Sequence, residues 1–394
     1  MIFFLYDLFR FSFFCIFVGI HTALMVGLFL EWRRDRRSGA VQSGGSQDAP
    51  PLVSVIVPVR NEERRLERLL RSLVRQDYPS AEYIFIDDRS SDATSDLLKK
   101  FIPAQLPGKV IPISENPGPN HKQYALGKGI DEAAGTFLLF TDADCETPPG
   151  WISAMVSRMS DPRIGATIGP VFKKPGGEGF FHLYQCFDHA VRYMYLAGST
   201  GLGAAGGGFG NNLILRRETL DVIGGYGSVP DSPTEDAALV ARIRSSSHYR
   251  IRSALGEETF VITIGESTWK NLLNQTLRWN NGGLFSPDPA TRFNFGFLMI
   301  TISMGIIAIP VIPFISSLWT LSAAVLLAMT MNTIAVLKLF GSALPQKGLL
   351  AYLFQLAFTP VYFTGLTILG FLGIPVHWKG SGVTAKTEKK EKIL

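Results

Sequence analysis

Two aspartates separated by one residue form the first pattern in this chain that could do chemistry. Asp142 and Asp144 follow the apolar run 137–140, which predicts a buried strand just before them. Two carboxylates on one loop can share a hard divalent cation, and that cation can bridge the oxygens of a diphosphate. The pattern therefore indicates a metal and diphosphate site. An ordinary turn, in which aspartates bond nearby amides, is the alternative.

Acidic residues recur at two further places. Asp88 follows the strand-like run 83–86, where a turn leading to a helix cap is the alternative. Glu235 and Asp236 follow Thr234, which suits the start of a helix, so both acids could simply complement the helix dipole. In a catalytic role, one of these two carboxylates would take the proton of an acceptor hydroxyl as a general base.

A later segment joins a cation to an aromatic ring. Gln275, Arg278 and Trp279 are spaced i, i+3 and i+4, so a helix would place them on one face. The arginine could bind phosphate and the tryptophan could provide an apolar platform. Because Trp269 and several leucines occur in the same segment, an amphipathic helix at a membrane surface is the alternative.

Apolar runs alternate with helical patterns between residues 52 and 140, as a mostly parallel sheet requires. The predicted strands are 53–57, 83–86, 110–113 and 137–140. Asn61 is placed to cap the helix after the first strand, and residues 123–134 predict the helix before the fourth. The fold class is therefore α/β. Ligands of such sheets bind beyond the carboxyl ends of the strands, which is where Asp88 and Asp142 fall.

The glycine- and alanine-rich segment 198–210 is too poor in side chains to form a packed core element for long. Glycine allows backbone conformations and close approaches that other residues do not. The composition therefore predicts a mobile loop or a close approach of the backbone to a ligand.

The composition places part of the chain in lipid. Of the 394 residues, 46% are hydrophobic, which is too many for an ordinary soluble enzyme. Residues 11–30 carry no formal charge at neutral pH and are long enough to span a bilayer. A cleaved signal peptide is the alternative, but no small-residue cleavage site follows. Residues 295–314, 318–340 and 349–374 predict three more membrane segments, interrupted by prolines, so we expect four, give or take one.

Charge next to these segments sets the expected orientation. Arg33, Arg34, Arg36 and Arg37 follow the first segment and assign that side to the cytoplasm, so we expect a multi-pass protein of an inner or plasma membrane with a cytoplasmic middle. The lysine-rich tail, residues 377–394, conflicts with four crossings. We therefore expect one C-terminal segment to lie in the interface.

The net charge of +5 is concentrated beside these segments, which favours anionic lipid over nucleic acid as the partner. The three cysteines fit neither a disulfide framework nor a zinc site.

The ordered set of motifs resembles the family 2 glycosyltransferases, which have the GT-A fold. The likeness extends from Val53 to Trp279, and its parts are residues 53–62, 86–90, 122–130, 141–144, 210–212 with 216–217, 235–236 and 275–279. One departure is Arg89, because many relatives have glycine there. The resemblance implies a UDP-linked nucleotide sugar as donor, with Mg²⁺ or Mn²⁺ as cofactor.

The resemblance also implies a role for each donor-site residue. Glu62 and Asp88 match residues that contact the base and sugar of the nucleotide. Lys122 matches a residue near the phosphates. Asp144 matches the metal ligand, and we assign Asp142 to the same metal and nucleotide-sugar site.

For the acceptor side, the resemblance makes Asp236 the general base, and we place Glu235 with it as a catalytic residue. Gln275, Arg278 and Trp279 match residues that line the donor and acceptor site and the diphosphate. The implied reaction is an inverting transfer of a hexose.

The membrane content narrows the acceptor. Processive polysaccharide synthases share the Gln-x-x-Arg-Trp motif but generally have more membrane helices, whereas ceramide glucosyltransferase and bacterial lipid or carotenoid glycosyltransferases are more similar. We therefore expect a lipid acceptor. A processive synthase is the enzymatic alternative, and a nucleotide-sugar-sensing membrane scaffold is the non-enzymatic one. The expected division of the chain is an anchor with its basic flank (1–37), a linker (38–51), the catalytic domain (52–285), a membrane region (286–376) and a basic tail (377–394).

Overall fold

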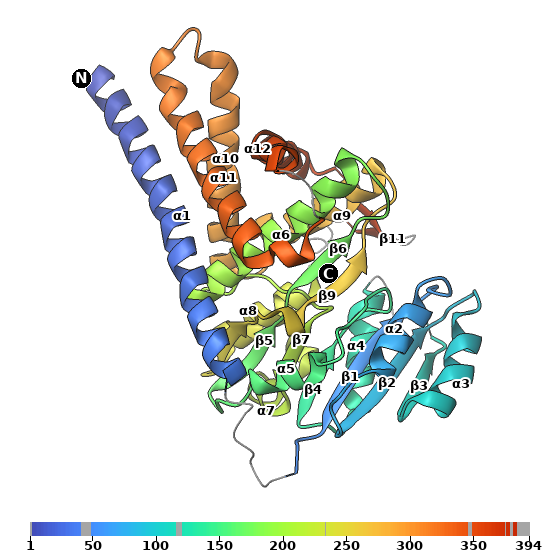
Figure 1. Ribbon diagram of the computed structural model, residues 1–394. Helices are drawn as coiled ribbons and strands as arrows, with labels where there is room; N and C mark the ends of the chain where they lie inside the picture. Colours follow the sequence, from blue (N-terminus) through green and yellow to red (C-terminus); the bar gives the residue numbers. More distant parts are fainter. Residues whose placement is uncertain are drawn as a thin grey trace, which may run out of the picture. The chain divides into compact units, whose positions relative to one another are not determined.

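The computed structural model describes residues 2–40, 49–115, 120–232, 234–345, 349–374, 376–378 and 381–383. The chain forms two compact units. We call Gly27–Lys174 with Tyr195–Gly265 the sheet unit, and Met1–Val26 with Pro175–Met194 and Glu266–Leu394 the helical unit. Two long helices, α1 (Ile2–Ala40) and α6 (Phe180–Gly201), contribute residues to both units (Figure 1).

A seven-stranded sheet forms the centre of the sheet unit. Its strands are β1 (Val53–Val59), β2 (Ala81–Asp88), β3 (Gly108–Ile113), β4 (Phe137–Phe140), β5 (Ile164–Ile168), β7 (Leu213–Arg216) and β8 (Arg250–Ser253). The order is β3-β2-β1-β4-β7-β5-β8, and every neighbouring pair is parallel except those that β7 makes with β4 and β5. The four predicted strands correspond to β1–β4, so the expected α/β fold with a mostly parallel sheet is confirmed.

Helices cover both faces of this sheet because strand side chains alternate in direction. On one face, Val53, Val55 and Val57 belong to an apolar core with residues of α2 (Leu66–Val74), α3 (Thr94–Gln105) and α5 (Trp151–Ser157). The opposite face of β1 packs against α4 (His121–Asp131). There a side chain in place of Gly129 would put its Cβ only 2.7 Å from Ile56 Cγ2, so glycine permits the close contact.

The remaining elements of the sheet unit are short. They are β6 (Val171–Lys174), α7 (Arg217–Val222), η2 (Tyr226–Ser228), α8 (Glu235–Ser246), η3 (Glu257–Thr259) and β9 (Val261–Ile264). β6 and β9 pair in parallel as a separate two-stranded sheet.

Buried acids fix the last turns of α1 to the sheet unit. Glu31 is 1% exposed, accepts a hydrogen bond from the Ser253 amide of β8 at 3.0 Å and pairs with Arg252 at 3.2 Å. Asp35 pairs with Arg158, the residue that follows α5, at 2.6 Å. A buried charge that loses its partner costs several kcal/mol, so these pairs define the register of α1 on the sheet unit.

The glycine-rich segment 198–210 differs from its prediction in part. Its first residues continue α6, and Gly201 lies so close to α1 that an added Cβ would overlap the carbonyl oxygen of Gly27. A Cβ at Gly27 would in turn overlap the carbonyl oxygen of Gly198. The close approach is therefore between two helix backbones of this chain, where only glycine leaves room.

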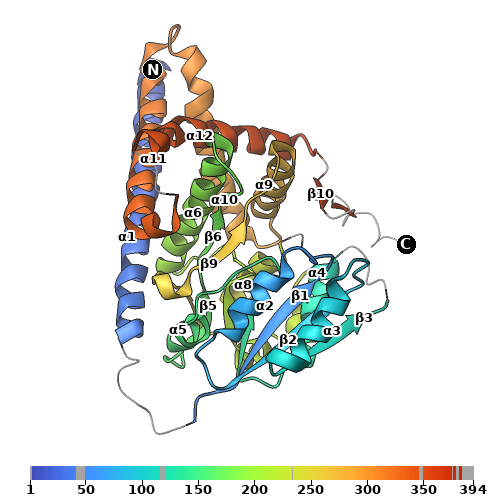
Figure 2. The ribbon, with the colours of Figure 1, turned by 45° about the vertical axis from the view of Figure 1, so that its right-hand side comes forward.

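The helical unit contains four main helices besides the parts of α1 and α6. They are α9 (Trp269–Leu284), α10 (Pro289–Ala308), α11 (Trp319–Phe340) and α12 (Leu349–Phe371), with turns η4 (Ile309–Val311), η5 (Ser316–Leu318) and η6 (Gly341–Ala343) and the hairpin β10 (Val376–Trp378) and β11 (Ser381–Val383). Figure 2 shows α12 running crosswise to the paired helices α10 and α11.

Among the described residues, four helices are long and apolar enough to cross a membrane. Their candidate spans are Leu5–Ser38, Pro289–Val311, Trp319–Ala343 and Leu353–Phe371. Each contains or overlaps one of the predicted segments, which fits association with a membrane. Pro310 falls in the turn η4 at the end of α10, whereas Pro360 lies inside α12.

Candidate active site

One lysine gathers carboxylates from two elements of the sheet unit. Lys122, in the first turn of α4, lies with its Nζ 2.9 Å from Asp142 Oδ1 and 3.1 Å from Glu235 Oε1. Asp142 follows the carboxyl end of β4, and Glu235 begins α8 as predicted. Three residues that are far apart in sequence therefore meet at the edge of the sheet where ligands of α/β proteins bind.

The charges of this cluster depend on one another. Burial opposes the positive charge of Lys122, but Asp142, Glu235 and Asp236 outweigh that effect and raise its pKa well above the usual value. Burial, followed by the charge of Glu235, also raises the pKa of the neighbouring Tyr226 hydroxyl. Lys122 therefore stays a cation among acids, which suits it to a diphosphate.

Asp236 is held by backbone groups. Its Oδ2 accepts a hydrogen bond from the Gly210 amide and its Oδ1 from the Ala237 amide, both at 2.8 Å. Cβ atoms added at Gly208 and Gly210 would come within 3.0 Å of Asp236 atoms, so the second half of the glycine-rich segment packs directly against this residue. These contacts fix the carboxylate in one orientation while part of it stays accessible to solvent.

Asp144 is held from two sides. Its Oδ2 accepts a hydrogen bond from the Thr263 hydroxyl of β9 at 3.1 Å, and its carbonyl oxygen accepts one from Arg68 at 2.6 Å. The next residue, Cys145, is buried, and burial together with the charges of Asp144 and Asp142 raises the pKa of its thiol. A raised pKa favours the neutral thiol, and the buried Cys145 side chain packs within the sheet unit.

The donor set for a metal consists of the two aspartates. Within the described ranges, no three His, Cys, Asp or Glu side chains lie close enough together to hold an ion by themselves. Asp142 and Asp144 nevertheless fit Mg²⁺ or Mn²⁺, because such hard cations are often bound by one or two carboxylates together with phosphate oxygens.

A second charged group surrounds Asp88 at the end of β2. Asp88 pairs with Arg60 at 3.1 Å and with Arg89 at 2.8 Å, and Arg89 Nη2 donates to Nδ1 of His121 at 2.9 Å. Arg89 has a φ of 53°, a conformation that glycine adopts without strain. This φ angle explains why glycine suits the position. The ion pair with Asp88 shows that the arginine side chain occupies the space beside that carboxylate.

The predicted cap at Asn61 is wrong. Helix α2 begins at Leu66, and Asn61 has a φ of 53° with its side-chain oxygen accepting from the Ser91 amide at 2.8 Å. The Asn61 side chain therefore hydrogen-bonds across the sheet edge and does not cap helix α2. Glu62, 8% exposed, donates its amide to the Thr94 hydroxyl at 2.8 Å.

Gln275, Arg278 and Trp279 lie on α9 of the helical unit and form a second cluster there. Gln275 Nε2 donates to Glu266 Oε1 at 2.9 Å. The Trp279 ring centroid lies 5.5 Å from the ring of His189, and the Arg192 guanidinium lies 5.4 Å from it.

Sequence reasoning missed the α6 residues that contact this cluster. The available signal was a pair of opposite charges, Asp188 and Arg192, at i and i+4 within a largely apolar helix. It also missed Tyr226, Thr263 and Arg68, for which the sequence offers no local signal.

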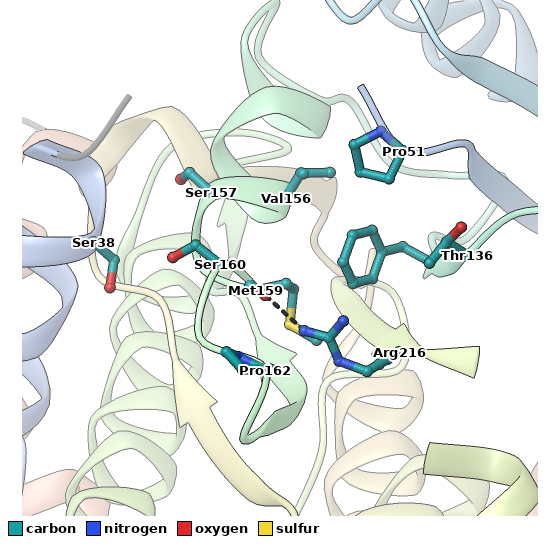
Figure 3. Close-up of a pocket in the computed structure, with 10 residues that line it drawn as sticks. Ser38, Pro51, Thr136, Val156, Ser157, Met159, Ser160, Pro162 and Arg216 are labelled. Carbon is teal, nitrogen blue, oxygen red and sulfur yellow. Dashed lines mark hydrogen bonds between the residues drawn. The ribbon is translucent and has the colours of Figure 1, made fainter. Parts of the chain in front are cut away.

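A pocket of about 450 Å³ opens at the other end of the sheet (Figure 3). It is lined by residues such as Pro51, Thr136 and Phe137, which precede or begin strands, and Arg216 there donates to the Met159 carbonyl oxygen at 2.8 Å. Because the acids follow the carboxyl ends of the strands, this pocket is not the acidic site.

Comparisons with known proteins agree with this arrangement. Residues 54–224 match the family described as Glycosyl transferase family 2. The beta-monoglucosyldiacylglycerol synthase of Trichormus variabilis is 26% identical over 282 residues, which are 68% of this chain and 58% of that protein. A GalNAc(5)-diNAcBac-PP-undecaprenol beta-1,3-glucosyltransferase of Campylobacter jejuni is 33% identical over 114 residues, 28% of this chain and 35% of that one.

Among solved structures, a mannosyltransferase from Pyrobaculum calidifontis, in complex with GDP-Man and Mn²⁺, has a TM-score of 0.54 at 19% identity and covers 90% of this chain and 98% of its own. That likeness concerns the fold, which is GT-A. The chain matches under two thirds of the length of its curated relatives such as the Trichormus protein. The matched segment, residues 54–224, is thus similar to the family 2 glycosyltransferases, and the fold is the GT-A fold.

Proposed function

We propose that the protein is a membrane-bound inverting glycosyltransferase that moves a hexose from a UDP-linked sugar to a membrane lipid. The observation that carries this proposal is the cluster in which Lys122 contacts Asp142 and Glu235 beside the backbone-held Asp236. The names of the two relatives, one acting on diacylglycerol and one on an undecaprenol-linked glycan, support a lipid acceptor.

Asp236 has the role of general base in this proposal. Its carboxylate takes the proton of the acceptor hydroxyl while that oxygen bonds to the anomeric carbon of the donor sugar. The bond from that carbon to the diphosphate breaks on the opposite side, so the configuration inverts. Lys122 offsets the charge of the departing nucleoside diphosphate, and the two amides on Asp236 keep its carboxylate in place.

The residues fit a divalent cation. Asp142 and Asp144 would hold Mg²⁺ or Mn²⁺, which supplies charge neutralisation to the diphosphate when bound. The hydroxyl of Thr263 and the guanidinium of Arg68 keep Asp144 oriented toward that role.

Glu62 and Asp88 are the proposed contacts to the nucleoside. Arg60 and Arg89 hold the Asp88 carboxylate in place, and its oxygens can accept hydrogen bonds from a base or from ribose hydroxyls. Arg89 stands where many relatives have glycine, and its side chain takes up space beside the proposed nucleoside site.

Gln275, Arg278 and Trp279 provide the proposed acceptor platform. The experiment supplies purified protein in nanodiscs with labelled UDP-sugars and a panel of lipids. We expect a product that extracts into organic solvent and carries one sugar. A water-soluble glycan of high molecular weight would indicate a processive synthase instead. Binding of UDP-sugars with neither transfer nor hydrolysis would indicate the sensing scaffold.

For topology, we propose that α1, α10 and α11 cross the membrane, that α12 lies in its cytoplasmic interface and that the sheet unit is cytoplasmic. The crosswise direction of α12 supports this (Figure 2). So do Phe354, Val361 and Ile368, which are exposed at seven-residue spacing along one side of α12. The lysine-rich tail then follows the positive-inside rule. A cysteine replacing Leu394 should resist a membrane-impermeant maleimide in intact cells. Labelling of that cysteine would show four crossings.

A further inference from the structure

We propose that Gln185, Asp188 and Arg192 of α6 are positioning residues for the acceptor platform of α9, and that the Asp188–Arg192 pair sets the orientation of the Trp279 ring. The inference rests on the proposed function for the role of that platform. Nothing in the motif itself points to α6, which is almost a hundred residues earlier in the chain.

The spacing on α6 matches the platform. Gln185, Asp188 and Arg192 are spaced i, i+3 and i+7, so one face of the helix carries all three. This face is linked to Gln275 at one end of the motif through Glu266 and contacts Trp279 at the other end directly. At one end, Gln185 exchanges two hydrogen bonds with the backbone of Glu266, at 2.7 and 3.0 Å, and the Glu266 carboxylate accepts from Gln275.

At the other end, Arg192 contacts Trp279 directly. The guanidinium lies 5.4 Å from the centroid of the Trp279 ring and 5.0 Å from that of Phe363 on α12. Both distances are within the range of attraction between a cation and a ring face. His189 closes another side of the indole with a perpendicular ring at 5.5 Å.

Asp188 fixes the arginine. Its Oδ2 accepts from Arg192 Nε at 2.8 Å, and the two side chains are only 2% and 15% exposed. This bond uses the Nε edge of the guanidinium and leaves Nη2, which is buried and has no hydrogen-bond partner among the described residues. The pair thus holds the guanidinium over the Trp279 ring, and the position of the guanidinium restricts how that ring can lie.

The energetics argue against a purely structural role. A buried ion pair is often no more stabilising than well-packed apolar residues of the same size. A buried donor without a partner adds a further cost. A helix contact selected for stability would use apolar side chains here, as α6 does elsewhere. The pair provides a defined ring orientation that apolar packing would leave to chance.

The test compares R192M, R192K and D188N in the full-length protein in nanodiscs, with the lipid that the wild type glycosylates. R158M is the matched control, because Arg158 is also a buried arginine paired with an aspartate but belongs to the sheet unit. We expect R192M to lower acceptor kcat/KM by about 10- to 100-fold, as small displacements of a positioned substrate do. UDP affinity and donor hydrolysis should change less than twofold. R192K, which keeps the charge, should recover part of the loss.

A second readout does not depend on turnover. With 5-fluorotryptophan incorporated and the W279F variant used for assignment, the Trp279 fluorine resonance should shift or broaden in R192M and D188N and stay unchanged in R158M. An unchanged resonance, or an equal loss of donor hydrolysis and lipid transfer, would overturn the inference. If the wild type transfers no sugar to any lipid, the proposed function fails, and the resonance still decides whether α6 positions Trp279.

Discussion

The two clusters of candidate site residues are held by different kinds of interaction. In the sheet unit, Lys122, Asp142 and Glu235 are fixed by charges within 3.1 Å, on backbone that strand ends and helix starts place. In the helical unit, Trp279 is fixed by a ring and a guanidinium at more than 5 Å, on helix faces that packing places. We therefore expect the carboxylate cluster to be sensitive to a change in the charge of a side chain. The aromatic cluster should be sensitive to a change in the position or orientation of a side chain.

The largest effect should come from Asp236→Asn, which tests the chemical side of this contrast. The asparagine side chain keeps one oxygen that can accept a backbone hydrogen bond, but it cannot take up the proton of the substrate hydroxyl. Sugar transfer should fall by about 10²–10⁴-fold, as expected for the loss of a general base, while UDP affinity stays within twofold. Single-turnover transfer and equilibrium UDP binding measure the two quantities. Turnover equal to that of the wild type would remove Asp236 from the base assignment.

The second effect concerns the cation. Asp144→Ala should weaken binding of the metal–nucleotide complex, because the diphosphate would lose the ligand that holds its counter-ion. Titration of UDP with and without MnCl₂ should show a metal-dependent gain of affinity in the wild type and little gain in the variant. Thr263→Val, which removes only the hydroxyl that orients Asp144, is the matched control and should keep most of the gain. Full transfer activity in excess EDTA would contradict the prediction.

The same contrast explains what the sequence could predict. Asp88 ends β2, Asp142 lies two residues after β4 and Glu235 begins α8, so predicting the strands and helices also located the acids. Asp88 and Asp142 share one edge of the sheet because β2, β1 and β4 are parallel. The roles of these residues, carried over from the family resemblance, stay predictions.

The failures arise from contacts between distant segments. Asn61 could cap a helix or bond across to residue 91, and only the folded sheet edge decides between them. The glycines of segment 198–210 are compatible with a loop and with a close crossing of two helices. The sequence does not distinguish these structures, because the partner residue Gly27 is far away in the chain. The role proposed for Arg192 likewise depends on its contacts with α9 and α12. Pairing of distant helices leaves little local trace in one sequence.

The third prediction tests geometry without chemistry, at the crossing of α1 and α6. Gly201→Ala would overlap backbone atoms of Gly27, which cannot move aside as a side chain could. The free energy of unfolding should fall by about 1–3 kcal/mol, the usual cost of overpacking. Thermal unfolding in detergent measures it. Gly19→Ala, on α1 like Gly27 but with nothing within 4 Å of its Cβ, is the control and should not destabilise the protein. Equal melting temperatures for both variants would show that the helices do not cross here.

The smallest effect should be a pH dependence of UDP binding. It tests whether the Asp88 group and the Lys122 cluster, both in the sheet unit, respond to pH independently. His121 accepts from Arg89 through Nδ1, so it must be neutral at that atom. Burial, together with the charges of Arg89 and Arg60, lowers its pKa despite the opposing charge of Asp88.

The sign of the effect follows from that lowered pKa. As the pH falls below the ordinary value of 6.5, the unfolded chain takes up a proton that the folded protein resists, so stability decreases until the lowered pKa is passed. Protonation then removes the acceptor for Arg89. UDP affinity should fall by about two- to tenfold between neutral and acidic pH, corresponding to one hydrogen bond of about 0.5–1.5 kcal/mol. His121→Asn keeps an acceptor but does not titrate, so its affinity should be nearly flat with pH, whereas His248→Asn should follow the wild type. If His121→Asn kept the wild-type slope, the pH dependence would have to come from the Lys122 cluster, and the two charged groups of the sheet unit could not be treated as independent.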